Sequence, residues 1–402
     1  MAARDDDAVI PLSDAIARVR ASLTPIEVET VGLGEAAGRV LAEAVTAGLT
    51  QPPFHASAMD GYAVRSGDLG DNPVTLPLDG ESAAGHALDR PIRPGSAVRI
   101  STGAALPEGA DQVVIQENTT RTGDQITLQD PPQPWRHVRT RGEDFTTGQT
   151  LLEAGLRLTA PRLALAAAGG AASLRVRRQP RIGVLASGDE LVAAGAPPGP
   201  GQIINSNGPA LMALLNAWGA IAIDLGIARD TPDAVRTALE QARDLDLLVT
   251  IGGASVGDHD HLRRVFAEMG GTLAFDKIAL KPGKPTWFGQ LPDLPVLGLP
   301  GNPVSALVVA ELVVRPAVER LLDETPRSRL RPVRLMVDLP GNGPRETWIR
   351  GRFDAETGRV RPSGSQDSGL ISALARAELL IPRAVDAPPT RAGQMINVLF
   401  LD

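Results

Sequence analysis

Residues 247–260 read L-L-V-T-I-G-G-A-S-V-G-D-H-D, residues 276–285 read D-K-I-A-L-K-P-G-K-P, and residues 299–305 read L-P-G-N-P-V-S. These three motifs decide the fold. The first begins with an apolar, β-branched run at 247–251 and continues into a loop of glycines and carboxylates. An α/β sheet presents its ligand-binding groups in this way, at the carboxyl end of a strand. We therefore predict a buried strand followed by a functional loop.

Strand and helix patterns alternate around these motifs. Two further strand patterns occupy residues 181–185 and 221–227. The stretch between them has apolar residues at helical spacing, namely Leu211, Leu214, Leu215 and Trp218. With the strand at 247–251, this order predicts a mostly parallel sheet with helices on both faces. A last helix is expected at 304–322, with a bend before Pro316.

The rest of the chain predicts smaller parts around this sheet, so that the fold class is multidomain, α/β and β. Short β patterns between Gly, Pro and Asp turns indicate an inserted β domain, and short alternating runs indicate a second β domain at the C-terminal end. A short helix is also expected at 33–45. The predicted boundaries are 8–23 with 179–325 for the α/β domain, 24–50 with 145–178 for a linking domain, 51–144 for the inserted β domain and 330–402 for the C-terminal β domain.

Composition limits the class of protein. The chain has 402 residues, 43% of them hydrophobic and 22% charged, as in ordinary soluble globular proteins. Its net charge of -7 argues against a general nucleic-acid binder. It has no cysteine, which excludes disulfides and a cysteine nucleophile. The N-terminal residues do not resemble a signal peptide, and no apolar run reaches the roughly 18 residues of a membrane span. We therefore expect a cytoplasmic protein without membrane partners.

Carboxylates follow the three predicted strands of the α/β sheet. Glu190 follows the first, Asp230 the second, and Asp258 and Asp260 the third. For each residue taken alone, helix capping or solvation of a loop is the better explanation. Because parallel topology brings these loops to one edge, however, the carboxylates would repel one another unless a cation bound between them. The pattern favours a Mg²⁺ site or a catalytic site.

The second and third motifs supply groups for an anion. Lys277, Lys281 and Lys284 lie on a stretch stiffened by prolines and suit phosphate or another oxyanion, although a solvated basic loop is the alternative. Asn302 is a candidate N-cap before a helix whose first N–H groups favour an anion.

Ser255 lies in G-A-S-V-G, which has the letters of a nucleophile elbow. That elbow also requires a His and an acid later in the fold, and here the glycines lead into a charged loop. A hydroxyl that contacts phosphate or stabilises the turn is the better interpretation. The five histidines show no metal-ligand spacing, and no P-loop or dinucleotide fingerprint occurs.

Six motifs occur along the chain: S-A-M-D-G-Y-A at 57–63, S-G-D-E-L at 187–191, N-S-N at 205–207, G-G-A-S-V-G-D at 252–258, K-P-G-K-P at 281–285 and L-P-G-N-P-V-S at 299–305. Together they resemble the molybdopterin molybdenumtransferase family, which also includes the C-terminal part of gephyrin. The resemblance covers nearly the whole chain in order. It implies an enzyme that inserts molybdate into adenylylated molybdopterin and releases AMP in a Mg²⁺-dependent hydrolysis.

The resemblance also implies roles for individual residues. The acidic set that handles metal and phosphate would be Glu190, Asp230, Asp258 and Asp260, with Glu190, Asp258 and Asp260 as metal ligands. The anion-binding and substrate-binding set would be Lys277, Lys281, Lys284, Ser255, Asn302 and Ser305. Asp60, Thr102 and Asp144 match further catalytic positions, and Arg345 and Arg350 are weaker candidates from the C-terminal domain.

Further implications concern assembly. The family forms elongated homodimers of four-domain subunits, with an elongated linking domain and an α/β domain of the molybdenum-cofactor-binding type. Its active cleft lies between the α/β domain of one subunit and parts of the other. Molybdopterin adenylyltransferase and cofactor-accepting molybdoenzymes would be further partners.

Two rival functions remain open at the level of sequence. A molybdopterin adenylyltransferase uses a similar α/β domain, but the inserted and C-terminal β domains argue against it. A non-catalytic scaffold is the second rival. The retention of the like-charged carboxylates with the lysines argues against a scaffold, since a scaffold has no need of them.

Overall fold

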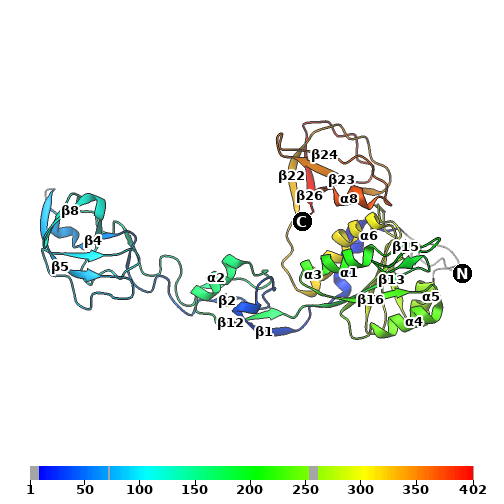
Figure 1. Ribbon diagram of the computed structural model, residues 1–402, viewed down its shortest axis with the longest axis horizontal. Coiled ribbons are helices and arrows are strands. Elements are labelled where there is room, and N and C mark those ends of the chain that lie inside the picture. The colour runs from blue at the N-terminus through cyan, green and yellow to red at the C-terminus, as the bar shows by residue number, and fades with distance from the viewer. Residues whose placement is uncertain (1–8, 71–72, 253–260, 402) are drawn as a thin grey trace.

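The structure is a computed structural model that describes residues 9–70, 73–252 and 261–401. The molecule is elongated (Figure 1). An α/β part and the C-terminal β part lie together at one end, and a separate β part lies at the other end. A narrow arm built from two passes of the chain connects the two ends.

The α/β part contains a six-stranded sheet. Its order is β16-β13-β17-β21-β20-β18, and the first four strands are parallel. The bounds are β13 Arg181–Ser187, β16 Ile221–Ala228, β17 Leu247–Ile251, β18 Thr272–Phe275, β20 Trp287–Gln290 and β21 Pro295–Leu299. Only the pairings of β20 are antiparallel. The prediction of a mostly parallel sheet is confirmed.

Helices cover both faces of this sheet, as predicted. On one face α1 (Leu12–Ser22), α3 (Asn207–Ala217) and α6 (Pro303–Val309) share a core with alternate strand residues such as Val184 and Val249. On the other face α4 (Pro232–Gln241) and α5 (His261–Glu268) share a second core with residues that include Leu185, Leu248 and Val296. Neighbouring strand residues point to opposite faces, which explains the two cores.

The helix expected at 304–322 is confirmed, with a local irregularity. After α6, residues Ala310–Val314 form one π-helical segment, and α7 continues over Arg315–Leu321. The irregular segment lies immediately before Pro316, where the ring of proline obstructs regular helical hydrogen bonding.

The far β part is a six-stranded sheet with the order β7-β4-β6-β5-β9-β8. The bounds are β4 Gly61–Val64, β5 Val74–Ser82, β6 Ala97–Ile100, β7 Gln112–Ile115, β8 Thr119–Thr122 and β9 Gln125–Leu128. It has its own apolar clusters on its two sides, one around Tyr62 and Val114 and one around Ala63 and Val113. A short pair, β3 (Ala56–Ser57) with β10 (Val138–Arg139), lies at its base.

In the arm, segments from before and after the far sheet lie side by side. Antiparallel pairs join β1 (Val28–Gly32) to β12 (Ser173–Arg177) and β2 (Val45–Thr46) to β11 (Thr150–Leu152), with α2 (Ala160–Ala168) packed beside them.

The helix predicted at 33–45 is wrong. Only a 3-10 turn, Leu33–Glu35, forms there. Val40 belongs to the core of the α/β part and its neighbour Leu41 to the core of the arm. Consecutive side chains point to opposite sides of an extended backbone, but only about 100° apart on a helix. An extended backbone is therefore needed for the side chains of Val40 and Leu41 to enter two different cores.

The C-terminal β part includes a strand from the α/β part. Its sheet order is β19-β23-β24-β22-β26-β25. The bounds are β19 Leu280–Lys281, β22 Leu330–Leu335, β23 Glu346–Asp354, β24 Arg359–Pro362, β25 Leu379–Arg383 and β26 Met395–Phe400, with α8 at Ile371–Ala375. In β19, Lys281 pairs with Thr347 of β23. Within the described ranges, no helix combines the length and apolar character needed to cross a membrane.

Candidate functional site

A cleft of about 1300 Å³ lies between the α/β part and the C-terminal β part. Its floor is the carboxyl edge of the parallel sheet, where β13, β17 and β21 end. Its sides include the segments around β15 (Ile203–Ile204) and β19, together with β23 and the turn at 340–345. Parallel topology places all the strand ends at this one edge.

Two of the predicted carboxylates line this cleft, and they have different surroundings. The hydroxyl of Ser187 donates to Asp230 Oδ1 at 2.9 Å, and the backbone N–H of Asp189 approaches Asp230 Oδ2 at 3.4 Å. The exposed Glu190 carboxylate has no hydrogen bond or ion pair to any residue that the structure describes. Asp230 is thus held in place, whereas Glu190 is available for a ligand.

Two glycines lie beside the carboxylates. Gly188 has φ +154°, which L side chains rarely adopt, and its Cα lies close to the Glu190 carboxylate, since a Cβ there would be 2.5 Å from Glu190 Oε2. On the next strand, Gly252 has φ +91°, and a Cβ there would lie 2.5 Å from the carbonyl oxygen of Ser187. The backbone conformation favours glycine at both positions, and at Gly252 the neighbouring backbone also leaves no room for a side chain.

Three predicted site residues, Ser255, Asp258 and Asp260, lie outside the described residues. In the part of the chain that is described, no group of three or more His, Asp and Glu side chains is arranged to hold a metal ion. Glu190 is the one predicted metal ligand within that part. Its hard oxygen donors fit Mg²⁺, which typically takes one or two carboxylates and keeps water ligands.

All three predicted lysines line the cleft. They are also the only lysines in the chain, and the remaining basic residues among its 40 Lys and Arg are arginines. Lys277 Nζ lies 3.4 Å from Asp276 Oδ2, and that buried carboxylate also pairs with Arg263. Lys281 and Lys284 are exposed to the cleft and have no side-chain partner among the described residues.

The lysine loop is held from two directions. Pairing of β19 with β23 fixes the backbone of Lys281 against the C-terminal β part. On the other side, a Cβ on Gly283 would lie 2.5 Å from Val309 Cγ2, so the loop touches the α6 helix. The stiffness predicted from the prolines is therefore supplemented by tertiary contacts.

Asn302 and Ser305 lie at the start of α6, and both line the cleft. Asn302 occupies the N-cap position, but its side chain makes no capping bond. Its amide instead donates to Ser368 Oγ of the C-terminal part at 3.0 Å. The predicted N-cap position is confirmed, but the side chain does not cap the helix because a tertiary partner accepts from its amide. Ser305 is buried.

The C-terminal part contributes residues that the sequence assigned weakly or not at all. Arg345 lines the cleft, and its guanidinium has no partner among the described residues. Asn342 fixes the turn that bears it, because its amide donates to the carbonyl oxygens of Arg345 and Arg383 at 2.9 and 3.0 Å. Arg350, by contrast, is buried outside the cleft lining, donates to the backbone of Ser365, and has a pKa lowered by burial.

Other cleft residues carried no individual prediction. Ile203 and Ile204 are exposed apolar residues on β15. Asn207 is buried; its amide donates to the carbonyl of Gly301 at 2.8 Å, and its Oδ1 has no partner among the described residues. The N-S-N motif that follows two isoleucines was the available signal in the sequence.

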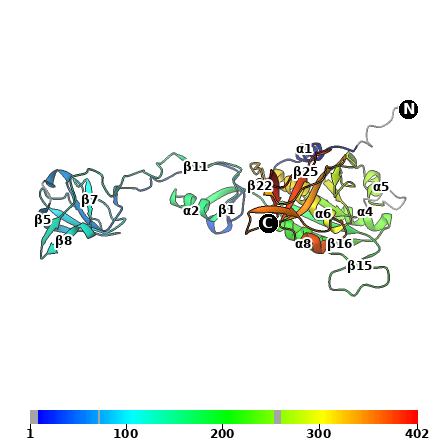
Figure 2. The same ribbon diagram turned by 90° about the horizontal axis from the view of Figure 1, so that it is seen from above.

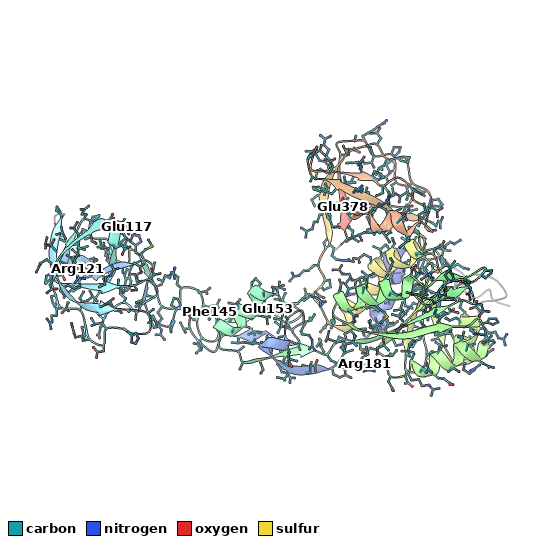
Figure 3. The ribbon with its side chains drawn as sticks, in the orientation of Figure 1. Glu117, Arg121, Phe145, Glu153, Arg181 and Glu378 are labelled. Atoms are coloured by element: carbon teal, nitrogen blue, oxygen red, sulfur yellow. The ribbon has the colours of Figure 1, made fainter. Side chains whose placement is uncertain are left out.

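Asp60, Thr102 and Asp144 are not brought to this cleft within one chain. Thr102 donates to Asp60 Oδ1 from its backbone N–H at 2.7 Å and from its hydroxyl at 3.1 Å. The backbone bond, then the hydroxyl and more weakly the charge of Arg99, lower the pKa of Asp60. Asp144 is exposed in the arm next to Phe145, whose position Figure 3 marks.

Three family models match the chain in consecutive segments. The MoeA N-terminal region (domain I and II) matches residues 10–170, a probable molybdopterin binding domain matches residues 183–320, and the MoeA C-terminal region (domain IV) matches residues 332–401.

Relatives and solved structures agree with these matches. The chain is 37% identical to a molybdopterin molybdenumtransferase of Haemophilus influenzae, over 93% of this chain and 94% of the other. It is 34% identical to one of Bacillus subtilis, over 98% and 94%. A crystal structure of a molybdopterin biosynthesis MoeA protein from Pyrococcus horikoshii superposes with a TM-score of 0.85 at 26% identity, over 98% of this chain and 100% of that one. The chain belongs to the molybdopterin molybdenumtransferase family.

Proposed function

We propose that this protein is a molybdopterin molybdenumtransferase, which transfers molybdenum to molybdopterin in the synthesis of the molybdenum cofactor. One observation supports this proposal above the others. Every lysine of the chain lies in the same cleft as Glu190, which has no side-chain partner among the described residues. The ammonium groups of Lys281 and Lys284 also have no partner there and repel one another, and a bound molybdate dianion or phosphate would relieve that repulsion.

In finer detail, the proposed substrates are molybdate and adenylylated molybdopterin. Lys277, Lys281 and Lys284 bind the oxyanion and the phosphates, with Asn302 and Ser305 adjacent. Metal insertion is a ligand exchange, so the main task of the protein is to hold the oxyanion next to the sulfur atoms of the pterin. No protein nucleophile is needed.

Mg²⁺ is the proposed cofactor for release of AMP. Glu190, together with Asp258 and Asp260, would hold the ion, which when bound neutralises charge on the phosphates. Asp230, oriented by Ser187, positions water or a phosphate group near that charge. Glu190 and Asp230 lie at the ends of neighbouring strands, so the two functions lie side by side.

A homodimer is proposed to complete the site. Within one chain, Asp60 directly precedes β4 and Thr102 closely follows β6 in the far β part, Asp144 lies in the arm, and none of the three lines the cleft. A second copy placed alongside would supply them to the cleft. The domain boundaries set out above, a cytoplasmic location, and contacts with molybdopterin adenylyltransferase and cofactor-accepting enzymes belong to the same proposal.

The direct test is AMP release from adenylylated molybdopterin, measured with and without molybdate and Mg²⁺. We expect release that depends on both, together with a molybdenum-loaded pterin by mass spectrometry. ATP-dependent adenylylation of molybdopterin would instead identify an adenylyltransferase. A folded dimer with neither activity would identify a scaffold.

A further inference from the structure

Two exposed isoleucines form an apolar lip on the cleft. Ile203 and Ile204 of β15 are 57% and 37% exposed, and both line the cleft. Figure 2 shows β15 at the base of a loop that projects from the α/β part. Single exposed apolar residues are common on protein surfaces. An exposed apolar pair in a cleft that also contains charged side chains favours a ligand that has an apolar face as well as charged groups.

The backbone attaches this lip to the proposed reacting groups. Ile203 N–H donates to the carbonyl oxygen of Glu190 at 2.7 Å. Ile203 also pairs with Leu191 of β14 (Leu191–Val192), which directly follows Glu190 in the sequence. Main-chain hydrogen bonds therefore hold the lip next to the backbone of Glu190.

The order of strands gives the cleft two different ends. β16 and β13, which precede Asp230 and Glu190, lie at one side of the sheet, and β18, which precedes Lys277, is the outermost strand at the other side. The carboxylates and the lip thus share one end of the cleft, and Lys277 lies towards the opposite end, at the start of the segment that continues to Lys281 and Lys284. A substrate that spans the cleft must have chemically different ends.

We propose that the lip packs against the adenine ring of the adenylyl group, an assignment that rests on the function proposed above. Molybdate is an anion and belongs at the lysine end, so the sulfur atoms that receive the metal must also lie there. The adenylyl group at the other end of the phosphoanhydride then extends past the carboxylates to the lip. A flat purine covers exposed isoleucine side chains and removes them from water.

The test is calorimetric titration of AMP and of ribose 5-phosphate, which lacks the ring, into the full-length protein. The variant is the double substitution Ile203→Asn and Ile204→Asn. Ile221→Asn is the matched control, because Ile221 is a 44% exposed strand isoleucine outside the cleft lining. We expect the double variant to bind AMP about tenfold more weakly, in the range that apolar contacts usually provide. Ribose 5-phosphate binding and the control should not change.

Unchanged AMP affinity, or an equal loss for AMP and ribose 5-phosphate, would overturn the assignment. Loss of binding of a free pterin with AMP unaffected would assign the lip to the other ring and also overturn it. Molybdenum insertion is measured in parallel on the wild type. If the wild type inserts molybdenum but the double variant binds AMP normally, only this inference is rejected. If the double variant binds AMP more weakly but the wild type inserts no molybdenum, only the proposed reaction is rejected.

Discussion

The hydroxyl of Ser187 donates to Asp230 Oδ1 at 2.9 Å, which joins the ends of the neighbouring strands β13 and β16. One oxygen of Asp230 is therefore occupied within the protein. The adjacent Glu190 has no such partner in the described part of the chain. The two carboxylates are consequently expected to differ in function even though they lie on neighbouring loops.

Glu190→Gln should lower kcat for AMP release by roughly 100-fold or more, because it removes an ionised ligand without removing a packing contact. The free energy of unfolding should change by less than about 0.5 kcal/mol, since the side chain is exposed and has no partner among the residues that the structure describes. Steady-state kinetics and urea denaturation measure the two quantities. Glu356→Gln, an exposed carboxylate in the turn after β23, is the control. Full activity of Glu190→Gln would refute the role.

The three lysines provide a direct probe of occupancy of the cleft. Apart from the N-terminal amino group, they are the only primary amines in the chain. Molybdate at ten times its dissociation constant should slow their acetylation roughly tenfold, by mass action. Lys277 should react most slowly without molybdate, because it is 23% exposed and paired with Asp276. Peptide mass spectrometry measures the rates. Equal rates with molybdate and with chloride at the same ionic strength would contradict anion binding here.

Two inactive variants should restore activity when mixed. Asp60→Asn and Lys281→Ala each disable the site, but a mixed dimer would combine one intact Lys281 cleft with one intact Asp60. If Asp60 acts on the partner's cleft, equal mixing with subunit exchange gives roughly a quarter of the wild-type activity. Native mass spectrometry verifies that mixed dimers form. Mixed dimers without activity would show that Asp60 does not act in trans.

Asp79 should stabilise the folded far β part, and this contribution should be lost at acid pH. Hydrogen bonds from Arg90, with further contributions from Arg93, lower the pKa of Asp79 to about 2. A lowered pKa in the folded state means that the stabilisation is complete above the ordinary value of about 4 and is lost as the pH falls towards 2. The difference in unfolding free energy between wild type and Asp79→Asn should therefore shrink over that interval. Hydrogen exchange of residues 74–82 in a urea series measures it.

The exposed Asp124 at the turn before β9 is the matched control for this pH dependence. The difference between wild type and Asp124→Asn should not vary over the same interval. A difference for Asp79→Asn that stayed constant with pH would show that the ion pair does not stabilise the sheet.

Arg157 holds the arm to the α/β part. Its guanidinium donates to the carbonyl of Gly38 in the arm at 3.0 Å, to that of Trp218 at 2.9 Å and to Glu324 Oε1 at 3.1 Å. Arg157→Ala should lower stability by about 1–3 kcal/mol, because these charge-assisted bonds are lost. Small-angle X-ray scattering should show a broader distribution of distances along the molecule. An unchanged profile, equal to that of the exposed control Arg352→Ala, would mean that other contacts fix the arm.

The sequence alone was sufficient for the parallel sheet and for most of the charged residues that line the cleft. Apolar β-branched runs mark β13, β16 and β17, and Glu190 and Asp230 follow them within a few residues. Both features are local, because periodicity and strand ends are defined by neighbouring residues. Parallel topology then brings the strand ends together without further information.

Only the tertiary structure decided which partners these local features find. The pairing of Lys281 with Thr347, the bond from Asn302 to Ser368 and the extended backbone at Val40 all depend on segments far apart in the chain. So does the separation of Asp60 from the cleft of its own chain. The pattern of side chains determines the local conformation of a segment. Which surfaces meet is decided by packing and burial between distant segments, and the sequence carries no periodic signal for those contacts.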